Sequence, residues 1–302
     1  MRARLLLALS VVLLASGCQR SALLWANRGL PAADASIVYA PASGLSLDLY
    51  RPRSGGAGPL PVVVFFYGGG WSSGRREDYR FVGRRLAEAG ILAVVADYRT
   101  WPASGFPGFV EDGAQAVAWA RANAAAHGGD PARLFVAGHS AGAQIAALLG
   151  TDPRYLHAHG LQPRTLAGVI GLSGPYDFDV TGGLVPIFGA PAQWPDAQAL
   201  NFVDGDEPPF LLLHGDADRR VEARDSRLLA ERVQATGGSA SLLLLEGAGH
   251  TAPLVALYDP AREPRVLDAI RRFTDANSAR AGLSGQRQAH PDPARKGVEA
   301  GE

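Results

Sequence analysis

The sequence predicts an α/β fold with a mostly parallel central sheet and helices on both of its faces. Continuous apolar runs at 62–66, 91–95 and 134–137 are typical of strands that other layers cover on both sides. Segments of helical character separate these runs, and this alternation of strand and helix predicts crossover connections in a parallel sheet. A length of 302 residues, 47% hydrophobic and 19% charged, is enough for one large domain with a substantial core.

The individual elements follow from local patterns along the chain. Residues 45–50 alternate apolar and polar side chains, as in a half-exposed strand. Glycines end two predicted helices, at 78–89 and 111–126. Residues 178–207 have little periodicity and many Gly, Pro and Ala residues, so we expect a small irregular insertion over the sheet edge. The other expected strands are 168–172, 208–214 and 241–245, and the other expected helices are 141–149, 222–236 and 265–276.

Composition excludes several classes of function. The formal net charge is zero, and no interleaving of basic and aromatic residues indicates a nucleic-acid partner. The glycine cluster at 68–74 fits neither common phosphate loop: Ser73 replaces a glycine of the dinucleotide fingerprint, and Arg75-Arg76 replaces the Lys-Ser/Thr of a P-loop. Cys18 is the only cysteine, which excludes an internal disulfide and a cysteine-based metal cluster. We expect neither a cofactor nor a metal.

The N-terminus resembles a bacterial export signal. Arg2 and Arg4 give a positive start, residues 5–14 form an apolar stretch that is short for a bilayer span, and small residues precede Cys18. This order resembles a lipoprotein signal, in which the cysteine becomes the lipidated first residue after cleavage. Gln19 in the next position resembles the outer-membrane sorting rule of Gram-negative lipoproteins. The resemblance implies an exported envelope protein that acyl chains on Cys18 hold on a membrane. The alternative is a plain secretory signal with a chance cysteine.

Composition also sets the expected domain boundaries. We expect the signal peptide at 1–17, a linker at 18–35 and the folded domain at 36–277. Residues 278–302 have few large apolar side chains and are expected to form a disordered tail.

The strand-to-helix junction around Ser140 is where we expect the chemistry. Gly138-x-Ser140-x-Gly142 follows an apolar strand and precedes an Ala/Leu-rich helix, as in a nucleophile elbow that presents a serine hydroxyl above the sheet. Such a hydroxyl needs a base to take its proton. Of the seven histidines, His250 lies in a glycine-flanked loop after the last expected strand and is the candidate base. His214, at the end of an apolar strand, is interpreted as part of a buried hydrogen-bond network.

A carboxylate must orient the base and stabilise its protonated form, and two aspartates compete for this role. Asp216 and Asp218 both follow the strand at 208–214, and spacing alone does not separate them. The chain order of serine, aspartate and histidine is typical of α/β-hydrolases and differs from the orders found in serine proteases.

Several motifs together resemble the carboxylesterases of the α/β-hydrolase superfamily, close to the hormone-sensitive-lipase-like and feruloyl-esterase-like branches. The resemblance covers about residues 45–275 and rests on Tyr67-Gly-Gly-Gly-Trp71, Asp97-Tyr-Arg99, Glu111-Asp112, Gly138-His-Ser-Ala-Gly142, Ser173-Gly174 with Tyr176-Asp177, His214-Gly-Asp-Ala-Asp218 with Val221, and Gly249-His250. It implies the α/β-hydrolase fold, Asp218 as the acid, and an oxyanion hole made by the backbone N–H groups of Gly69, Gly70 and Ala141. Tyr67 stands where the family most often has a histidine that braces the loop.

The expected function is hydrolysis of small or aryl carboxylic esters through an acyl-enzyme at Ser140, with His250 as the base. The insertion at 178–207 is expected to lie over this active site. The same triad also fits an arylformamidase or a peptidase, and a third alternative is a non-catalytic surface binding module, although such modules usually lack a triad residue. The expected partner is a small-molecule ester, and no obligate protein partner is evident.

Five aromatic residues lie in predicted loops near the strand ends. They could line an apolar acyl or aryl pocket, or they could pack the insertion onto the body of the domain. They are Trp71, Trp101, Phe106, Tyr176 and Trp194.

Overall fold

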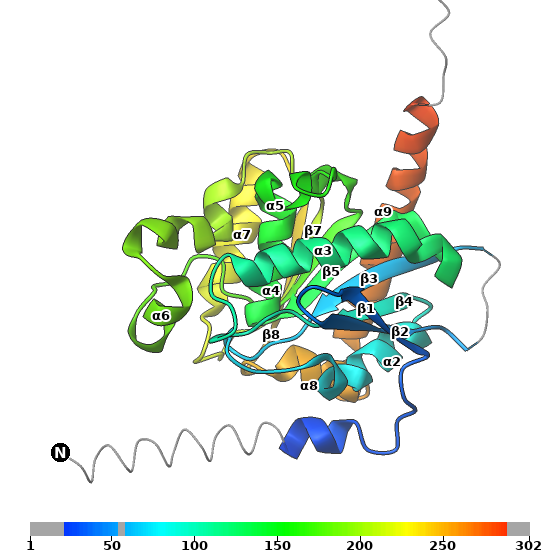
Figure 1. The fold of residues 1–302 in the computed structure, drawn as a ribbon, viewed down its shortest axis with the longest axis horizontal. Coiled ribbons are helices and arrows are strands. Elements are labelled where there is room, and N and C mark those ends of the chain that lie inside the picture. Colours follow the sequence, from blue (N-terminus) through cyan, green and yellow to red (C-terminus); the bar gives the residue numbers. More distant parts are fainter. Residues whose placement is uncertain (1–20, 54–57, 289–302) are drawn as a thin grey trace, which may run out of the picture.

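The computed structural model describes residues 21–53 and 58–288, and it confirms the α/β fold with a mostly parallel sheet. The sheet has eight strands in the order β1-β2-β4-β3-β5-β6-β7-β8 (Figure 1). Strands β3 to β8 are parallel to one another, and β2 runs antiparallel to both of its neighbours. The strands are β1 (Ala35–Ala40), β2 (Leu45–Tyr50), β3 (Leu60–Phe66), β4 (Leu92–Ala96), β5 (Gly129–His139), β6 (Gly168–Leu172), β7 (Phe210–Gly215) and β8 (Ala240–Leu245).

The middle of the sheet is apolar because helices cover both of its faces. Val64 of β3 pairs with Val94 of β4 on one side and with Val136 of β5 on the other, and all three side chains are buried. Burial on both faces is what produces the continuous apolar runs in the sequence. Every strand expected from the sequence is present, and β1 is an additional edge strand that the sequence did not predict.

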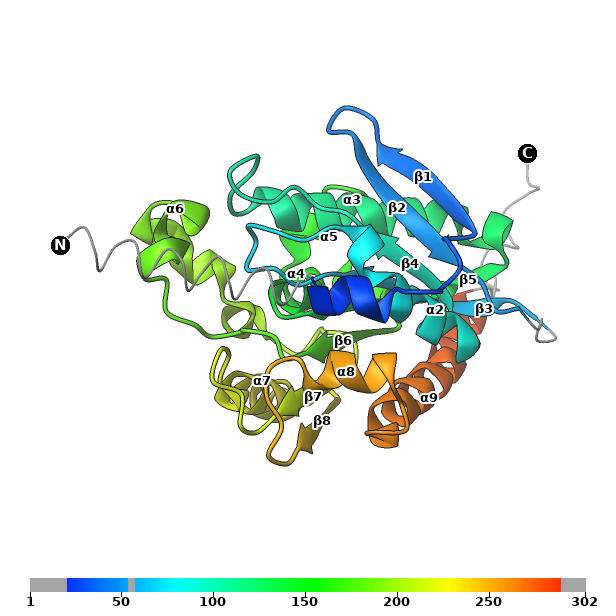
Figure 2. The same cartoon turned by 90° about the horizontal axis from the view of Figure 1, so that it is seen from below.

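Helices pack on the sheet in two groups. One face carries α2 (Arg80–Glu88), α8 (Ala252–Tyr258) and α9 (Pro264–Gln288), which lie nearest the viewer in Figure 2. The other face carries α3 (Gly108–Asn123), α4 (Ala141–Thr151), α5 (Pro153–His157) and α7 (Ala223–Ala235). None of the helices in the described ranges combines the length and the apolar character needed to cross a bilayer.

The segment between β6 and β7 is irregular, as the sequence predicted. It consists of α6 (Val185–Phe188) and short 3-10 turns at Gly182–Leu184, Pro191–Ala197 and Ala199–Phe202. The last of these turns contacts α4 and α7, while α6 lies at the outer edge of the domain in Figure 1. The insertion is thus attached to the helix that follows Ser140.

The N-terminal segment at 21–34, expected as part of a linker, instead packs on the domain. The side chain of Asn27 donates to the backbone oxygens of Glu77 and Asp78 and accepts from the N–H of Phe81, in the first turn of α2. It therefore caps a helix that begins more than 50 residues downstream, a contact that local composition does not reveal.

Helix α9 is longer than the sequence predicted. Val266 and Ile270 are buried and anchor its first turns on the sheet, and the helix continues to Gln288. Residues 278–288, expected in a disordered tail, are helical, because extending a helix from turns that are already anchored adds a backbone hydrogen bond for each further residue. The predicted signal peptide at 1–17, Cys18 and the last part of the predicted tail lie outside the described residues.

Candidate active site

Ser140 lies at a sharp turn between β5 and α4. Its backbone adopts φ 53° and ψ −120°, a left-handed conformation that is strained for any residue other than glycine. The flanking residues must be glycine. A Cβ on Gly138 would lie 2.1 Å from the carbonyl oxygen of Gly142, and a Cβ on Gly142 would lie 2.1 Å from that of Phe66. The turn predicted from the Gly-x-Ser-x-Gly pattern is therefore present, with its tight packing as the physical reason.

The hydroxyl of Ser140 is hydrogen-bonded to a histidine. Its Oγ donates to Nε2 of His250 over 2.9 Å, and Nδ1 of His250 donates to Oδ2 of Asp218 over 2.7 Å. An ionised carboxylate only accepts hydrogen bonds, so Nδ1 carries the ring proton and Nε2 is left as the acceptor. Serine, histidine and aspartate thus form one continuous chain of hydrogen bonds.

The three side chains come from three strand ends at one edge of the sheet. Ser140 follows β5, Asp218 lies in the loop after β7, and His250 lies in the loop after β8. Parallel strands place their carboxyl ends at the same edge, where ligands bind in open α/β sheets. Residues that are 110 positions apart in sequence come into contact there.

The structure separates the two aspartates that the sequence left as alternatives. Asp216 is exposed, and its Oδ1 accepts the backbone N–H of Gly247 over 2.7 Å. Asp218 is buried and faces His250. The structure therefore brings Asp218 to the histidine and uses Asp216 to brace the loop after β8.

Asp218 is held by four hydrogen bonds. Its Oδ1 accepts the backbone N–H groups of Arg220 and Val221, and its Oδ2 accepts from His250 and from Nε2 of His214. Burial acts to raise the pKa of Asp218, but the hydrogen bonds from Arg220 and His250 outweigh it and bring the pKa below its ordinary value. The carboxylate is therefore charged and fixed in orientation.

His214 forms part of a buried network, as the sequence indicated. Its Nδ1 is 2.7 Å from Oγ of Ser226, and its Nε2 is 3.2 Å from Oδ2 of Asp218 and 3.0 Å from the backbone oxygen of Val221. Both neighbours of Nε2 are acceptors, so that nitrogen carries the proton, and Nδ1 accepts from the serine hydroxyl. Burial lowers the pKa of His214, which favours this neutral form.

His250 is the histidine that contacts Ser140. Burial lowers its pKa below the ordinary value of 6.5, although the hydrogen bond that it donates to Asp218 acts in the opposite direction. Its imidazole is consequently neutral around pH 7 and able to accept a proton. His139, next to Ser140 in sequence, is fully buried, and burial lowers its pKa to about 3. Nε2 of His139 lies 3.1 Å from the backbone oxygen of His250, so this ring supports the loop that carries the base.

The glycine-rich loop at 67–74, here called the oxyanion loop, lies against the elbow. A Cβ placed on Gly68 would come within 3.2 Å of Cβ of Ser140. Among the described residues, the N–H groups of Gly69 and Gly70 donate to no acceptor. The N–H of Ala141, at the first position of α4, has no partner within its helix. The three donors that the resemblance implied are thus available to a ligand.

Tyr67 replaces the usual histidine by packing under the oxyanion loop. Its ring stacks on Tyr98 with centroids 4.5 Å apart and on Tyr79 with centroids 5.8 Å apart. The hydroxyl of Tyr98 donates to the backbone oxygen of Tyr67 over 2.8 Å. Stacking and this hydrogen bond brace the loop from below, which is the role that the family histidine was expected to have.

Most of the five loop aromatics are buried and pack against the insertion, and one of them, Phe106, also lines a pocket. Trp71, Phe106 and Tyr176 are buried. Trp71 stacks on Phe178 and makes an edge contact with Phe188, both from the insertion side of the domain. The two exceptions reach solvent: Trp101 is exposed, and Trp194 lines a surface pocket of about 400 Å³.

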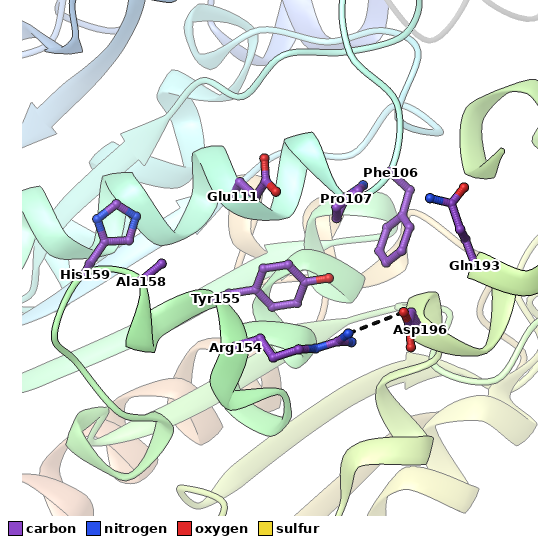
Figure 3. Close-up of a pocket in the computed structure, with 9 residues that line it drawn as sticks. All are labelled: Phe106, Pro107, Glu111, Arg154, Tyr155, Ala158, His159, Gln193 and Asp196. Carbon is purple, nitrogen blue, oxygen red and sulfur yellow. Dashed lines mark hydrogen bonds and ion pairs between the residues drawn. The ribbon is translucent and has the colours of Figure 1, made fainter.

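A second pocket of about 280 Å³ lies between α3, α5 and the insertion (Figure 3). Arg154 crosses its floor, with Nη1 3.3 Å from Asp196 and its remaining nitrogens on Asp152. Since these carboxylates already satisfy the guanidinium, the pocket offers no free cation. Other lining residues include Phe106, Glu111, Tyr155 and Gln193. Within 21–53 and 58–288, no three His, Cys, Asp or Glu side chains are grouped so as to hold a metal.

Comparison with known proteins identifies the relatives of this chain. The family model described as BD-FAE matches residues 47–233. The isoprenylcysteine alpha-carbonyl methylesterase ICME of Arabidopsis thaliana is 33% identical in an alignment of 250 residues that covers 75% of this chain and 58% of that protein. Esterase LipC of Mycobacterium tuberculosis is 32% identical in an alignment of 258 residues that covers 78% of this chain and 63% of that protein. The chain thus spans less than two thirds of the length of these curated relatives.

Solved structures agree with the family match. The apo form of Thermogutta terrifontis esterase 2 superposes with a TM-score of 0.70 at 26% identity, covering 82% of this chain and 96% of that one. This chain therefore has the same fold as that esterase over nearly the full length of the esterase structure. Because the matched family region includes more than half of the sequence, the chain belongs to the BD-FAE family and has the α/β-hydrolase fold.

Proposed function

We propose that this chain is a serine carboxylic-ester hydrolase that acts on small or aryl esters through an acyl-enzyme at Ser140. The observation that carries the proposal is the chain of hydrogen bonds from Ser140 through His250 to Asp218. In the first step His250 takes the hydroxyl proton, Oγ attacks the ester carbonyl, and the proton passes to the departing alcohol. In the second step a water gives its proton to His250 and releases the acid, which restores the serine.

The free N–H groups beside the elbow support the same proposal. When Oγ adds to the carbonyl carbon, negative charge develops on the carbonyl oxygen. Gly69, Gly70 and Ala141 would donate to this oxygen, and each fixed donor of this kind lowers the barrier by about 3 to 4 kcal/mol. These donors are backbone groups held beside the N-terminus of α4, so they do not have to reorganise during the reaction.

The names of the relatives favour ester bonds over amide bonds. LipC is named an esterase and ICME a methylesterase. Structures of the Thermogutta terrifontis enzyme, at 26% and 25% identity, contain propionate and butyrate. No relative among these is named a formamidase, a peptidase or a binding module, so these alternatives are second to an esterase for short acyl groups.

The proposal is tested with a panel of substrates given to the purified mature protein. We expect hydrolysis of p-nitrophenyl acetate and butyrate, weaker hydrolysis of long-chain esters, and little or no cleavage of an arylformamide or a peptide anilide. A labelled fluorophosphonate should modify Ser140. Folded protein that cleaves the arylformamide or the anilide faster than every ester would contradict the assignment of the bond.

We further propose that the protein is exported and lipid-anchored in the bacterial envelope through Cys18, with the outer membrane as its destination. The sequence pattern of 1–19 supports this proposal. In cells that process lipoproteins, labelled palmitate should enter the wild-type protein and not Cys18→Ser, because the acyl groups attach at that sulfur. Label in the variant, or none in the wild type, would contradict the anchor and leave a plain secretory signal.

A further inference from the structure

Trp71 holds a strained position directly after the two glycines of the oxyanion loop. Its φ is 56°, in the left-handed region that residues other than glycine rarely adopt. The side chain is nevertheless buried, with 5% of its surface exposed. Such a conformation persists only where the surroundings hold it, so the contacts of Trp71 decide how firmly the preceding N–H groups are placed.

Three kinds of contact hold Trp71. Its backbone oxygen accepts the N–H of Trp101 over 2.7 Å, and the other two kinds involve the side chain. The ring packs against Phe178 and Phe188, with centroids 5.5 and 4.8 Å away. The indole Nε1–H donates to Oε1 of Gln144 over 3.1 Å. Aromatic packing alone allows the ring to slide, whereas a directed hydrogen bond fixes one orientation.

Gln144 is a buried amide within the apolar run 141–150 of helix α4. It lies four residues after Ser140 in α4, on the same face of the helix, and none of its surface is exposed. Its Oε1 accepts from Trp71, and its Nε2 donates to the backbone oxygen of Ala197 over 2.9 Å. A buried amide is unfavourable unless both ends are bonded, and here the two ends bind two different segments.

We propose that Gln144 is a positioning residue for the reaction: through Trp71 it fixes the oxyanion loop, and through Ala197 it ties that loop to the insertion. The inference rests on the proposed esterase function and deepens it. Gln144 does not touch the substrate. It acts by keeping the N–H groups of Gly69 and Gly70 where the developing oxyanion needs them, which is the part of catalysis most sensitive to small displacements.

Two variants test the inference. Gln144→Met keeps the length and volume of the side chain and removes both hydrogen bonds. Trp71→Phe keeps an aromatic ring while removing the indole donor and part of the ring volume, so it remains informative where Gln144→Met does not fold. Thr151→Val is the matched control. Thr151 is buried in the same helix, and its Oγ1 donates to the backbone oxygen of Ala147 over 3.1 Å, remote from the loop.

The decisive measurements separate positioning from stability. We expect Gln144→Met to lower kcat and kcat/KM for p-nitrophenyl acetate by roughly 10- to 100-fold, with KM nearly unchanged. The Ki of a boronic acid, which forms a tetrahedral adduct on the serine, should rise by the same factor. Thr151→Val should change neither rate nor Ki, even where its melting temperature falls.

A double variant tests the route through Trp71. If Gln144 acts through the indole, Gln144→Met/Trp71→Phe should be no worse than the more impaired single variant. Additive losses would overturn this route, and a lowered melting temperature with unchanged kcat and Ki would reduce Gln144 to a packing residue. Wild-type protein that neither hydrolyses esters nor reacts with fluorophosphonate would overturn the proposed function and this inference together. An active wild type with unaffected variants would overturn the inference alone.

Discussion

Ser140→Ala is expected to lower kcat for p-nitrophenyl acetate by roughly 10⁴- to 10⁶-fold. The variant loses the hydroxyl oxygen that His250 contacts through Nε2, so the acyl group has no nucleophile to receive it. The residual rate would come from water attacking an ester that the oxyanion hole still polarises. Steady-state hydrolysis and fluorophosphonate labelling of the folded variant measure both losses.

Ser173→Ala is the matched control for this experiment. Ser173 is also a buried serine with positive φ, 50°, and it follows β6, the strand next to that of Ser140. Among the described residues, its Oγ has no hydrogen-bond partner, so no base activates it. Activity should survive in Ser173→Ala. Equal activity in both variants, or a loss confined to Ser173→Ala, would refute Ser140 as the nucleophile.

The sequence predicted those features that depend on local pattern. Strands buried on both faces need long apolar runs, so β3, β4 and β5 were recognisable without knowledge of their partners. The elbow was recognisable because close packing requires glycine at Gly138 and Gly142. Once a parallel sheet was inferred, its strand ends had to meet at one edge, and this placed His250 near Ser140 before any distance was known.

Features that depend on distant partners could not be predicted in this way. Asp216 and Asp218 lie in one loop, and spacing did not separate them. The resemblance implied Asp218, and the fold shows that Asp218 faces His250 while Asp216 faces Gly247. Gln144 is an isolated polar residue in the apolar run 141–150, and its partner Trp71 is 73 residues away. The only sequence signal for such a residue is an amide within an apolar segment, because an amide that is buried there needs hydrogen-bond partners.

Asp218→Asn is expected to lower kcat by roughly 10⁴-fold while leaving the fold intact. The amide can donate a hydrogen bond to Nδ1 of His250, which would stabilise the tautomer with the proton on Nε2 and remove the acceptor that Ser140 needs. The imidazolium formed during the reaction would also lose its stabilising charge. Asp216→Asn is the control. It lies two residues away, and its amide oxygen can still accept the N–H of Gly247, so its kcat should stay close to that of the wild type.

The pH dependence of kcat/KM distinguishes loss of this charge from general damage. In the wild type, activity should rise with pH as His250 loses its proton, with a midpoint below 6.5 because burial lowers that pKa. The carboxylate of Asp218 acts to raise the pKa of His250, so Asp218→Asn should move the midpoint to still lower pH, at a much lower plateau. A variant with an unchanged midpoint, or Asp216→Asn with the larger loss, would show that Asp218 is not the acid partner of His250. A midpoint that moves to lower pH would show that the carboxylate of Asp218 acts on the pKa of His250. Damage to packing alone would lower the plateau of kcat/KM and leave the midpoint unchanged.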